Sequence, residues 1–539
     1  MKKIINLFFY IYYGRNFEKI FTHNSKKIFG TDKEKLVYKV KKCLLELDLE
    51  KNFELLDVKE NELGKFYNIK KSFHQYMWVK FINTEFFTMH LILSIALNKK
   101  FFFPLPKIYI QNISNLVGVN YFLSKFLWII ALGIIFSKDL LMICVSFFSF
   151  LKITKNSNYI YCKSLSNIGS RNSKNMNYDN FFSWLFKRIN LKNSTVFLHT
   201  NKKIKNYTEE NNPDIKIFST KYKKNIDFII FGLNDLSVYI SAFFDCLRLL
   251  IRCLVRKKFN SVILLFEIFK FKIVLNSRKT YQYALFNNSY MVYRPLWTYA
   301  QENKKKGSVI FYFYSINNDP LLHLIKGGEY IHYSVFSLLT WSNYILWGKD
   351  QLNWLKKQIK LIENYLIVDF IPYEGDDILL PKSKPKKLCI FDSIPRNDLT
   401  YFKLHSQYNI YDIEYILSFL DDIIDVTKEY NNLEIYLKTK RNNKTTHPDY
   451  LNYLDEINKK NSRLKIVENN ISAQSLMNGT DLSISIPYTS TALIANSLNV
   501  KSIYYDPSGI LPESSNNFKL INLINGKDNL EKCITKYLK

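Results

Sequence analysis

The sequence predicts an α/β protein whose last third folds as a doubly wound parallel sheet. From residue 386 onward, short apolar segments typical of strands alternate with segments in which apolar residues recur at helical spacing. Such alternation favours a parallel sheet with helices on both faces. The chain has 539 residues, 47% of them hydrophobic, so it is long enough and apolar enough for two domains with large cores.

The second domain follows the Pro- and Lys-rich segment 380–387, so we expect domains at 1–385 and 386–539. Its clearest element is the helix 411–430, because the apolar residues there form one stripe. The other predicted elements are strands at 388–391, 433–438, 464–467, 482–486 and 501–505, and helices at 449–459, 473–477, 492–498 and 529–538.

The first domain is less regular in pattern. The segments 152–177 and 202–225 are polar and are predicted to be loops. The apolar block 228–255 contains four charged residues, a pattern typical of one or two amphipathic helices. Nearer the boundary, strands are predicted at 308–314, 344–347 and 366–371, and a helix at 349–359.

The most hydrophobic region, 121–152, is interrupted by Lys125, Lys138 and Asp139. Its two uncharged runs have 12 residues each, whereas a clean membrane span needs roughly 20. Two interpretations stay open: a shallow membrane hairpin with its tip at 137–139, and a pair of buried helices. The segment 1–14 starts with a basic and then an apolar run but lacks a small-residue cleavage site, which favours an uncleaved interfacial helix.

The formal net charge of +29 is unevenly distributed. From Lys386 onward there are 19 Lys and Arg against 18 Asp and Glu, which leaves 57 against 29 in the preceding part. A basic first domain suggests an anionic surface, either nucleic acid or anionic lipid. The sequence contains no zinc-finger spacing and no RRM-type aromatic signature, and we expect no nucleic-acid partner.

Cysteine and histidine usage gives no sign of a disulfide framework or a metal centre. The seven cysteines are scattered and form no C-x-x-C pair, which fits buried thiols in a reducing compartment. The eight histidines form no recognisable metal-binding pattern, so we expect no bound metal.

The segment 481–509, DLSISIPYTSTALIANSLNVKSIYYDPSG, places three hydroxyl residues between a predicted strand and a predicted helix. Thr489, Ser490 and Thr491 can be ordinary helix caps, which are frequent. They can also form an anion site with the exposed amides and the positive end of the helix dipole. Because ligands of doubly wound sheets bind at the carboxyl ends of the strands, the position of this loop favours the anion site.

A second polar cluster follows the predicted strand 433–438. Lys438, Lys440 and Arg441 are three cations at the carboxyl end of that strand, suited to clamp a diphosphate, although a solvated basic loop is the commoner meaning of such a run. There is no G-x-G-x-x-G, Walker or D-x-D motif, so phosphate would be held by the helix dipole, hydroxyls and cations without a metal.

Four blocks of the chain, in order, resemble the bacterial polysaccharide biosynthesis family named for its Pro-Phe-Thr-Ser motif. This chain reads Pro487-Tyr488-Thr489-Ser490, with a tyrosine in place of the phenylalanine. The other blocks are 293–315 with its Arg-Pro-Leu-Trp sequence, the tryptophan block 341–351 and the basic strand end 437–441. The matches run from about residue 294 to residue 509, and the preceding part has no clear counterpart.

The resemblance implies surface-polysaccharide assembly. Together with the residue pattern, it implies a GT-B-like glycosyltransferase, with two Rossmann-like domains facing a cleft and hydrophobic helical insertions in the first. In similar capsule transferases, a basic strand end and a Ser/Thr helix N-terminus hold the phosphate of a nucleotide-sugar donor, with no separate cofactor. We carry this role onto the residues Lys438, Lys440, Arg441, Thr489, Ser490 and Thr491.

The acceptor side is assigned to the Arg-Pro-Leu-Trp block. Arg294, Trp297 and Tyr488 are predicted to bind substrate, although Trp297 could equally fill the core. Glu302 is the predicted general base, with a surface carboxylate as the alternative interpretation. Glu329 is a rival base.

We therefore expect a glycosyltransferase of capsule or lipopolysaccharide synthesis that acts on a lipid-linked glycan. It would lie at the cytoplasmic face of the inner membrane, peripheral or shallowly inserted. The alternative is a non-catalytic scaffold of the same pathway with a degenerate nucleotide fold. Nucleic-acid binding, the third hypothesis, depends on charge alone. The first two differ in whether Lys440, Ser490 and Glu302 converge on one cleft.

Overall fold

The computed structural model describes most of the chain, and every structural statement below concerns the described residues. They lie in 11–149, in short segments between 158 and 219, and in 236–538. The gaps inside these ranges are 14–16, 29–30, 50–54, 56–67, 278–280, 288–291, 304–306, 317–333, 360–361, 369–370, 372–377, 379, 382–384, 398–411, 440–445, 469–470 and 512–520.

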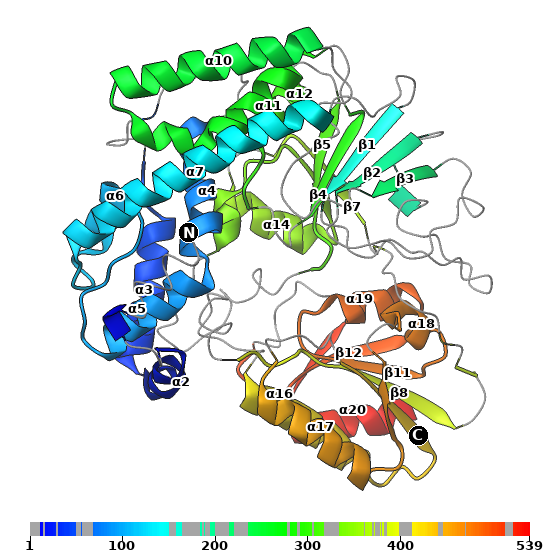
Figure 1. The fold of residues 1–539 in the computed structure, drawn as a ribbon. Coiled ribbons are helices and arrows are strands. Elements are labelled where there is room, and N and C mark those ends of the chain that lie inside the picture. Colours follow the sequence, from blue (N-terminus) through cyan, green and yellow to red (C-terminus); the bar gives the residue numbers. More distant parts are fainter. Residues whose placement is uncertain are drawn as a thin grey trace.

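Two parallel sheets form the framework of the molecule (Figure 1). The first has the order β3-β2-β1-β4-β5-β6-β7 and the second the order β10-β9-β8-β11-β12-β13. The strands of the first sheet are β1 (Asn158–Lys163), β2 (Ser194–His199), β3 (Ile215–Ser219), β4 (Tyr283–Asn287), β5 (Ser308–Tyr312), β6 (Asn343–Leu346) and β7 (Asn364–Ile367). Those of the second are β8 (Lys386–Phe391), β9 (Leu433–Lys438), β10 (Leu464–Val467), β11 (Leu482–Ser485), β12 (Lys501–Asp506) and β13 (Asn522–Asn525).

Both sheets therefore have the strand order 3-2-1-4-5-6 of the Rossmann fold, with a seventh strand added to the first. The predicted GT-B-like class, with two Rossmann-like α/β domains and helical insertions in the first, is confirmed. The second sheet begins at Lys386, directly after the Pro- and Lys-rich segment.

Side chains of the second sheet alternate between two cores, as the pleat of a strand requires. Leu388 and Ile390 of β8 join the core beneath α16 (Ile413–Val426), α17 (Pro448–Lys460) and α20 (Lys527–Leu538). Cys389 and Phe391 point to the other face, where α18 (Ala473–Met477) and α19 (Ser490–Ser497) contribute to a core shared with the first domain. The two domains are thus packed together through α18 and α19 (Figure 1).

The first domain carries a large helical part before and within its sheet. Its elements are α2 (Phe17–Ile28), α3 (Asp32–Leu45), α4 (Ile69–Met77), the π-helix η2 (Trp78–Ile82), α5 (Glu85–Ala96), α6 (Lys107–Ile113), α7 (Tyr121–Ser149), α10 (Leu236–Val255), the 3₁₀ helix η4 (Phe259–Leu264), α11 (Leu265–Asn276), α12 (Leu296–Asn303), the 3₁₀ helix η5 (Val335–Leu338) and α14 (Lys349–Gln358). Figure 1 shows α7, α10 and α11 grouped at the end of the molecule away from the second domain.

Several predictions for the first domain were wrong. The segment 152–177, predicted to be a loop, contains the central strand β1, and the segment 202–225 contains β3. Both strands are short and lie in a polar, basic context, and a parallel strand of five or six residues has no periodicity to distinguish it. The predicted N-terminal helix falls mostly on residues 1–10, which lie outside the described part.

The apolar region from Tyr121 is one continuous helix, so neither the hairpin nor the pair of helices was correct. The charges that interrupt its sequence do not interrupt the helix. Lys138 points outward with half of its side chain exposed, whereas Asp139 is buried and accepts a hydrogen bond from the Phe266 amide at the start of α11. Residues 121–146 are long and apolar enough to cross a membrane, and 28% of the most apolar window is buried against the protein.

Two buried histidines should make the first domain sensitive to acid. The His90 Nε2 accepts a hydrogen bond from the Phe102 amide and its Nδ1 contacts the Tyr13 hydroxyl, and burial lowers the pKa of His90 to about 3. Burial likewise lowers the pKa of His74 to about 4. Because the unfolded chain takes up these protons near pH 6.5, stability is lost as the pH falls from 6.5 toward 4.

We expect the free energy of unfolding to fall by about 2 kcal/mol per buried histidine between pH 7.5 and pH 5.0. Urea titrations at the two pH values measure this fall. The variant His90→Gln should lose about half of it, whereas the exposed His23→Gln variant should keep it in full. An unchanged pH dependence in His90→Gln would show that His90 is not responsible.

Candidate functional site

The candidate site lies at the carboxyl edge of the second sheet, where the C-terminal ends of its strands meet. In a doubly wound sheet the binding crevice opens where the strand order reverses, and here the reversal lies between β8 and β11. The loop after β11 is the predicted Pro487-Tyr488-Thr489-Ser490 segment. The structure therefore puts this motif at the position that the topology favours for a ligand.

The hydroxyl groups of this loop do not cap α19. Thr489 is the N-cap residue, but within the described structure its side chain makes no capping hydrogen bond to the helix amides. Its hydroxyl instead donates to the Ile486 carbonyl at 2.9 Å, and Thr491 Oγ1 lies 2.9 Å from the hydroxyls of both Thr489 and Ser485. The first amides of α19 thus keep the character of an anion-binding helix terminus.

The backbone of the loop is held in an uncommon conformation at Tyr488. Its φ angle is +64°, in the left-handed region that a bulky residue rarely adopts. The ring is buried and packs against Tyr504, whose hydroxyl donates to the Thr489 carbonyl at 2.7 Å. Tyr488 was predicted to contact substrate, but its side chain lies in the core of the second domain, where it supports the conformation of the loop.

The predicted cationic cluster begins at the same level of the sheet. Phe391 of β8 is in register with Lys438 of β9 on one side and with Ser485 of β11 on the other. Neighbouring strands lie about 4.8 Å apart, so the backbones at Lys438 and Ser485 are separated by about 10 Å. Lys438 is half-buried, and Lys440 and Arg441 lie outside the described residues.

Sequence reasoning missed the loop that follows β8. Asp392 and Ser393 are buried directly after the strand, and Tyr450 of α17 donates a hydrogen bond to the Asp392 carboxylate. Arg396 pairs with Thr446 through an antiparallel bridge, which joins this loop to the one after β9. The signal that could have revealed these residues is the adjacency of β8 and β11, which a single sequence does not show.

The first domain reaches this edge through the loop after β5. The Ile316 amide donates a hydrogen bond to the Ser490 hydroxyl at 3.0 Å, so the N-terminus of α19 abuts the carboxyl end of a first-domain strand. A second contact joins the linker to α18, because the Ser475 hydroxyl donates to the Ile378 carbonyl at 2.8 Å. The carboxyl edges of the two sheets therefore meet at α19.

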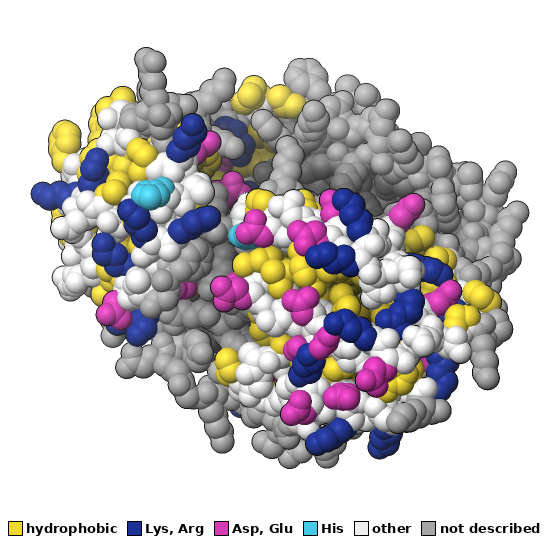
Figure 2. Space-filling view, turned by 90° about the horizontal axis from the view of Figure 1, so that it is seen from below, with side chains coloured by type: hydrophobic (Ala, Val, Ile, Leu, Met, Phe, Trp, Pro, Cys, Tyr) yellow, Lys and Arg dark blue, Asp and Glu magenta, His cyan; other side chains and the backbone are white. Residues whose placement is uncertain are grey.

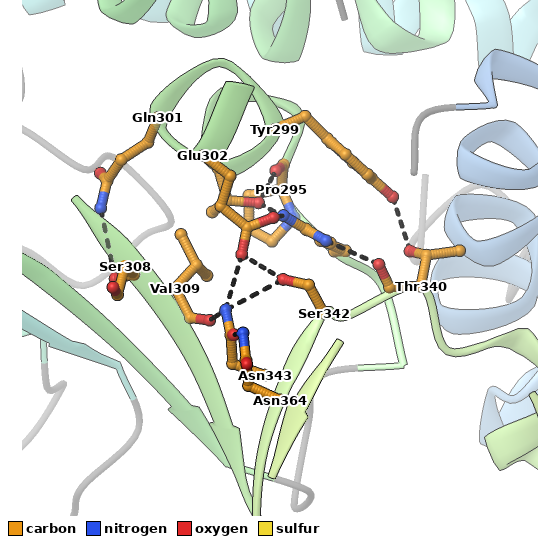
Figure 3. Close-up of polar contacts among 12 residues, drawn as sticks. Pro295, Tyr299, Gln301, Glu302, Ser308, Val309, Thr340, Ser342, Asn343 and Asn364 are labelled. Carbon is orange, nitrogen blue, oxygen red and sulfur yellow. Dashed lines mark hydrogen bonds and ion pairs between the residues drawn. The ribbon is translucent and has the colours of Figure 1, made fainter. Parts of the chain in front are cut away.

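The Arg-Pro-Leu-Trp block does not lie at this edge. Arg294 is fully buried and forms an ion pair with Glu302. Its Nε donates to the Thr298 hydroxyl at 2.9 Å, and its Nη1 donates to the Thr340 carbonyl at 2.6 Å. Figure 3 shows Glu302 pointing from α12 toward the start of β6, where Ser342 and Asn343 also donate hydrogen bonds to its carboxylate.

This geometry does not fit the predicted role of Glu302 as a general base. Asn343 is the first residue of β6, so Glu302 lies at the amino edge of the first sheet, the edge opposite to Ser490. Its carboxylate oxygens already accept hydrogen bonds from Arg294, Ser342 and Asn343. The alternative interpretation, a surface carboxylate, does not fit either. Glu329, the rival base, lies outside the described residues.

The two predicted substrate-binding residues of this block are structural as well. Arg294 has no exposed surface to offer a ligand. Trp297 is also fully buried and packs among the rings of Tyr161, Tyr281 and Phe286, so it fills the core of the first domain. The structure thus brings Lys438, Thr489, Ser490 and Thr491 to one sheet edge and separates Arg294, Trp297 and Glu302 from them.

The chain matches a known protein family over more than half of its length. The model of the family described as polysaccharide biosynthesis PFTS motif protein matches residues 241–534, more than half of the chain. This chain therefore belongs to the polysaccharide biosynthesis PFTS motif family, as its four sequence blocks predicted. No curated protein matches the chain by sequence.

Solved structures show only distant similarity. The apo structure of OtsA shares 8% identity with a TM-score of 0.40, over 71% of this chain and 92% of OtsA. UDP-GlcNAc 2-epimerase from Methanocaldococcus jannaschii shares 10% identity with a TM-score of 0.35, over 71% and 92% of the two chains. The glycotransferase of kitacinnamycin shares 8% identity with a TM-score of 0.33, over 71% and 91%.

Proposed function

We propose that this chain is a glycosyltransferase of surface polysaccharide synthesis that takes its sugar from a nucleotide-activated donor without the help of a metal. The observation that carries the proposal is the position of the Pro487–Ser490 loop. It lies at the reversal of strand order, at the carboxyl edge of a Rossmann-like sheet, and its helix N-terminus abuts the other domain. A site between two such edges suits a donor held by one domain and an acceptor approached by the other.

The donor phosphates would bind between α19 and the end of β9. The first amides of α19 and the Thr491 hydroxyl supply donors, and Lys438 supplies positive charge about 10 Å away across β8. Lys440 and Arg441 follow Lys438 in sequence and extend the positive charge of this edge. This combination of helix terminus, hydroxyls and cations is the one that binds phosphate without a metal.

The product would be capsule or lipopolysaccharide, and the acceptor would be a lipid-linked glycan. The enzyme would lie at the cytoplasmic face of the inner membrane. Family membership supports the polysaccharide pathway. The hydrophobic helices α7 and α10 support a place next to lipid, where a lipid-linked acceptor is found.

Donor binding is tested by calorimetry with a panel of UDP-, GDP-, CMP- and dTDP-sugars. The double variant Lys438→Ala with Lys440→Ala should bind the preferred donor at least 100-fold more weakly, a loss of about 2.7 kcal/mol. Lys465→Ala is the matched control, because Lys465 lies on the neighbouring strand β10 and pairs with Glu434 at 2.8 Å. Retained affinity in the double variant would contradict the proposed phosphate site.

A non-catalytic scaffold of the same pathway is the alternative function. The specific observation in its favour is that Glu302, the predicted base, forms a largely buried ion pair with Arg294 and so has a structural role. A measurement of nucleotide release distinguishes the two functions. A glycosyltransferase releases nucleotide from its donor when lipid-linked acceptor is present. A scaffold binds pathway proteins and releases no nucleotide from any donor in the panel.

A further inference from the structure

Helices α7 and α10 form a two-helix layer on the outside of the first domain. The Tyr239 hydroxyl of α10 donates to the Ile143 carbonyl of α7, and farther along Phe136 of α7 shares a small apolar cluster with Leu249 and Leu250 of α10. Residue numbers rise along one helix as they fall along the other, so the two run antiparallel. Both helices contact α11 beneath them.

The outward face of this layer, which we name the α7/α10 face, is apolar. Fifteen exposed large hydrophobic side chains belong to it, whereas only five others are found elsewhere in the described residues. On α10 they recur at helical spacing from Leu236 to Val255, and the most exposed on α7 is Phe122, at 83%. The members are Tyr121, Phe122, Phe126, Ile129, Leu140, Leu141, Val145, Leu236, Ile240, Phe244, Leu247, Ile251, Leu254 and Val255, together with Phe259 at the start of the adjoining η4.

Such a face is too large to be ordinary protein surface. Fifteen large side chains that are roughly half exposed present on the order of 1,000 Å² of apolar area, since the five aromatic ones alone have about 150–250 Å² each. The largest apolar patch on a typical monomer is roughly 300–600 Å². A patch of this size marks an interaction with lipid or with another protein.

The charges on the two helices decide between these occupants. Every exposed charged side chain on them is basic: Lys125, Lys138, Arg248 and Arg252. Their two acids are shielded, since Asp139 is buried and Asp245 lies within 4.0 Å of both Arg248 and Lys272. Basic side chains around an apolar helix face fit anionic lipid headgroups, with long aliphatic stems lying along the apolar surface.

The opposite face of the molecule shows the contrast. Figure 2 views the second domain from below, where Lys and Arg are interspersed with Asp and Glu. Within the second domain, several acids and bases form ion pairs, such as Asp425 with Lys428 and Glu434 with Lys465. That face carries exposed charges of both signs, whereas the exposed charges on α7 and α10 are all basic.

We infer that the α7/α10 face docks on an anionic lipid bilayer, with both helices lying in the plane of the membrane surface. The contacts of α7 fix this orientation. Trp128 Nε1 donates to the Asn260 side chain at 3.0 Å, and the buried Asp139 accepts from the Phe266 amide. These inward contacts hold α7 against η4 and α11 along its length, and a membrane-crossing α7 would have to break them and expose Asp139 to hydrocarbon.

The inference extends the membrane location proposed above, and it is tested without any sugar donor. The full chain is floated with vesicles of phosphatidylcholine alone or with 30% phosphatidylglycerol (a composition on the order of that of an anionic membrane). The wild type should bind both, and more tightly with phosphatidylglycerol. The triple variant Phe122→Gln, Phe244→Gln and Ile251→Gln should bind both at least 10-fold more weakly.

Two further variants separate the apolar from the charged contribution. Arg248→Gln with Arg252→Gln should reduce only the gain from phosphatidylglycerol and its dependence on salt. Tyr365→Gln with Leu451→Gln, which removes exposed hydrophobic residues elsewhere, should bind like the wild type. Wild-type protein that does not float, or a triple variant that floats as well as wild type, would overturn the inference. So would a wild-type dimer that the triple variant converts to a monomer without any loss of lipid binding.

Depth measurements distinguish docking from crossing. A fluorophore on the exposed Cys144 reports one end of α7, and one on Gly133→Cys in a Cys144→Ser background reports its centre, where an added side chain meets nothing within 4 Å. Quenching by lipid-borne quenchers should place both at the same shallow depth, about 5–10 Å below the headgroups. A centre much deeper than the end would show that α7 crosses the bilayer. Failure of these tests would leave the donor-binding experiment unaffected.

Discussion

Replacing Arg294 with alanine should lower the free energy of unfolding of the first domain by about 3–5 kcal/mol. The change leaves the Glu302 carboxylate largely buried without its cation and removes the hydrogen bonds to Thr298 and Thr340. Removing one partner of a buried ion pair is costly because the remaining charge stays desolvated. Urea titration followed by tryptophan fluorescence measures the change, since Trp297 and Trp341 are buried in this domain.

The matched control is Arg248→Ala on α10. Arg248 is 74% exposed and lies 3.6 Å from Asp245, so the loss of its ion pair should cost less than about 1 kcal/mol. Replacing both Arg294 and Glu302 by apolar residues, in Arg294→Met with Glu302→Leu, should recover much of the stability lost in Arg294→Ala. If Arg294→Ala were no more harmful than Arg248→Ala, the ion pair would not be a structural centre of the domain.

Gly307→Ala should destabilise the first domain by about 3 kcal/mol or more, because it forces two strands apart. A Cβ at Gly307 would collide with the Tyr281 carbonyl oxygen and lie 2.8 Å from that of Gln282. Both obstacles are backbone atoms just before β4, and Ser308 donates a hydrogen bond to Gln282 there at 3.0 Å. The register of β4 against β5 would therefore have to shift.

Thermal and urea unfolding of Gly307→Ala measure this effect against Gly348→Ala. Gly348 precedes α14 in an extended conformation, and an added Cβ there meets nothing within 4 Å. That control should stay within about 1 kcal/mol of the wild type. Equal stability of the two variants would mean that the close approach at Gly307 relaxes without cost.

Most elements of the second domain could be predicted from its sequence, although strand β13 was missed. The strands 433–438 and 464–467 and the helix 473–477 were predicted with the bounds that the structure has. Strands with apolar runs and helices with apolar stripes alternate through most of this domain, so local pattern and tertiary structure agree there. The order of the strands could not be predicted, because a single sequence does not show which strands are neighbours.

The first domain was predicted less well because its pattern and its packing disagree. Strands β1 and β3 lie in basic, Asn- and Ser-rich sequence, and only pairing with their neighbours identifies them. The segment that forms helix α7 was predicted to be interrupted at Lys138 and Asp139. The sequence does not show that Lys138 points to solvent and that Asp139 accepts a hydrogen bond from the Phe266 amide.

The candidate site could be predicted only in part, because some of its residues follow from the order of the elements and others depend on packing. Ser490 and Lys438 follow strands of one sheet, so their position at its carboxyl edge could be expected from the alternation alone. Glu302 belongs to a helix that ends before a strand, and sequence alone does not show that it lies at the other edge. Arg294 occurs eight residues before it, a separation that did not suggest an ion pair.

The hydrogen bond between Ser490 and Ile316 has a consequence for how the molecule would open. A neutral hydrogen bond of this kind contributes about 1 kcal/mol, a factor of about five in an equilibrium. Thermal motion therefore breaks this tie many times while the rest of the chain stays folded. A hydroxyl can accept one hydrogen bond while it donates another, so an occupant can bind the Ser490 O–H while this bond stays made. An occupant that displaced the Ile316 amide would remove only one of the contacts between the two domains.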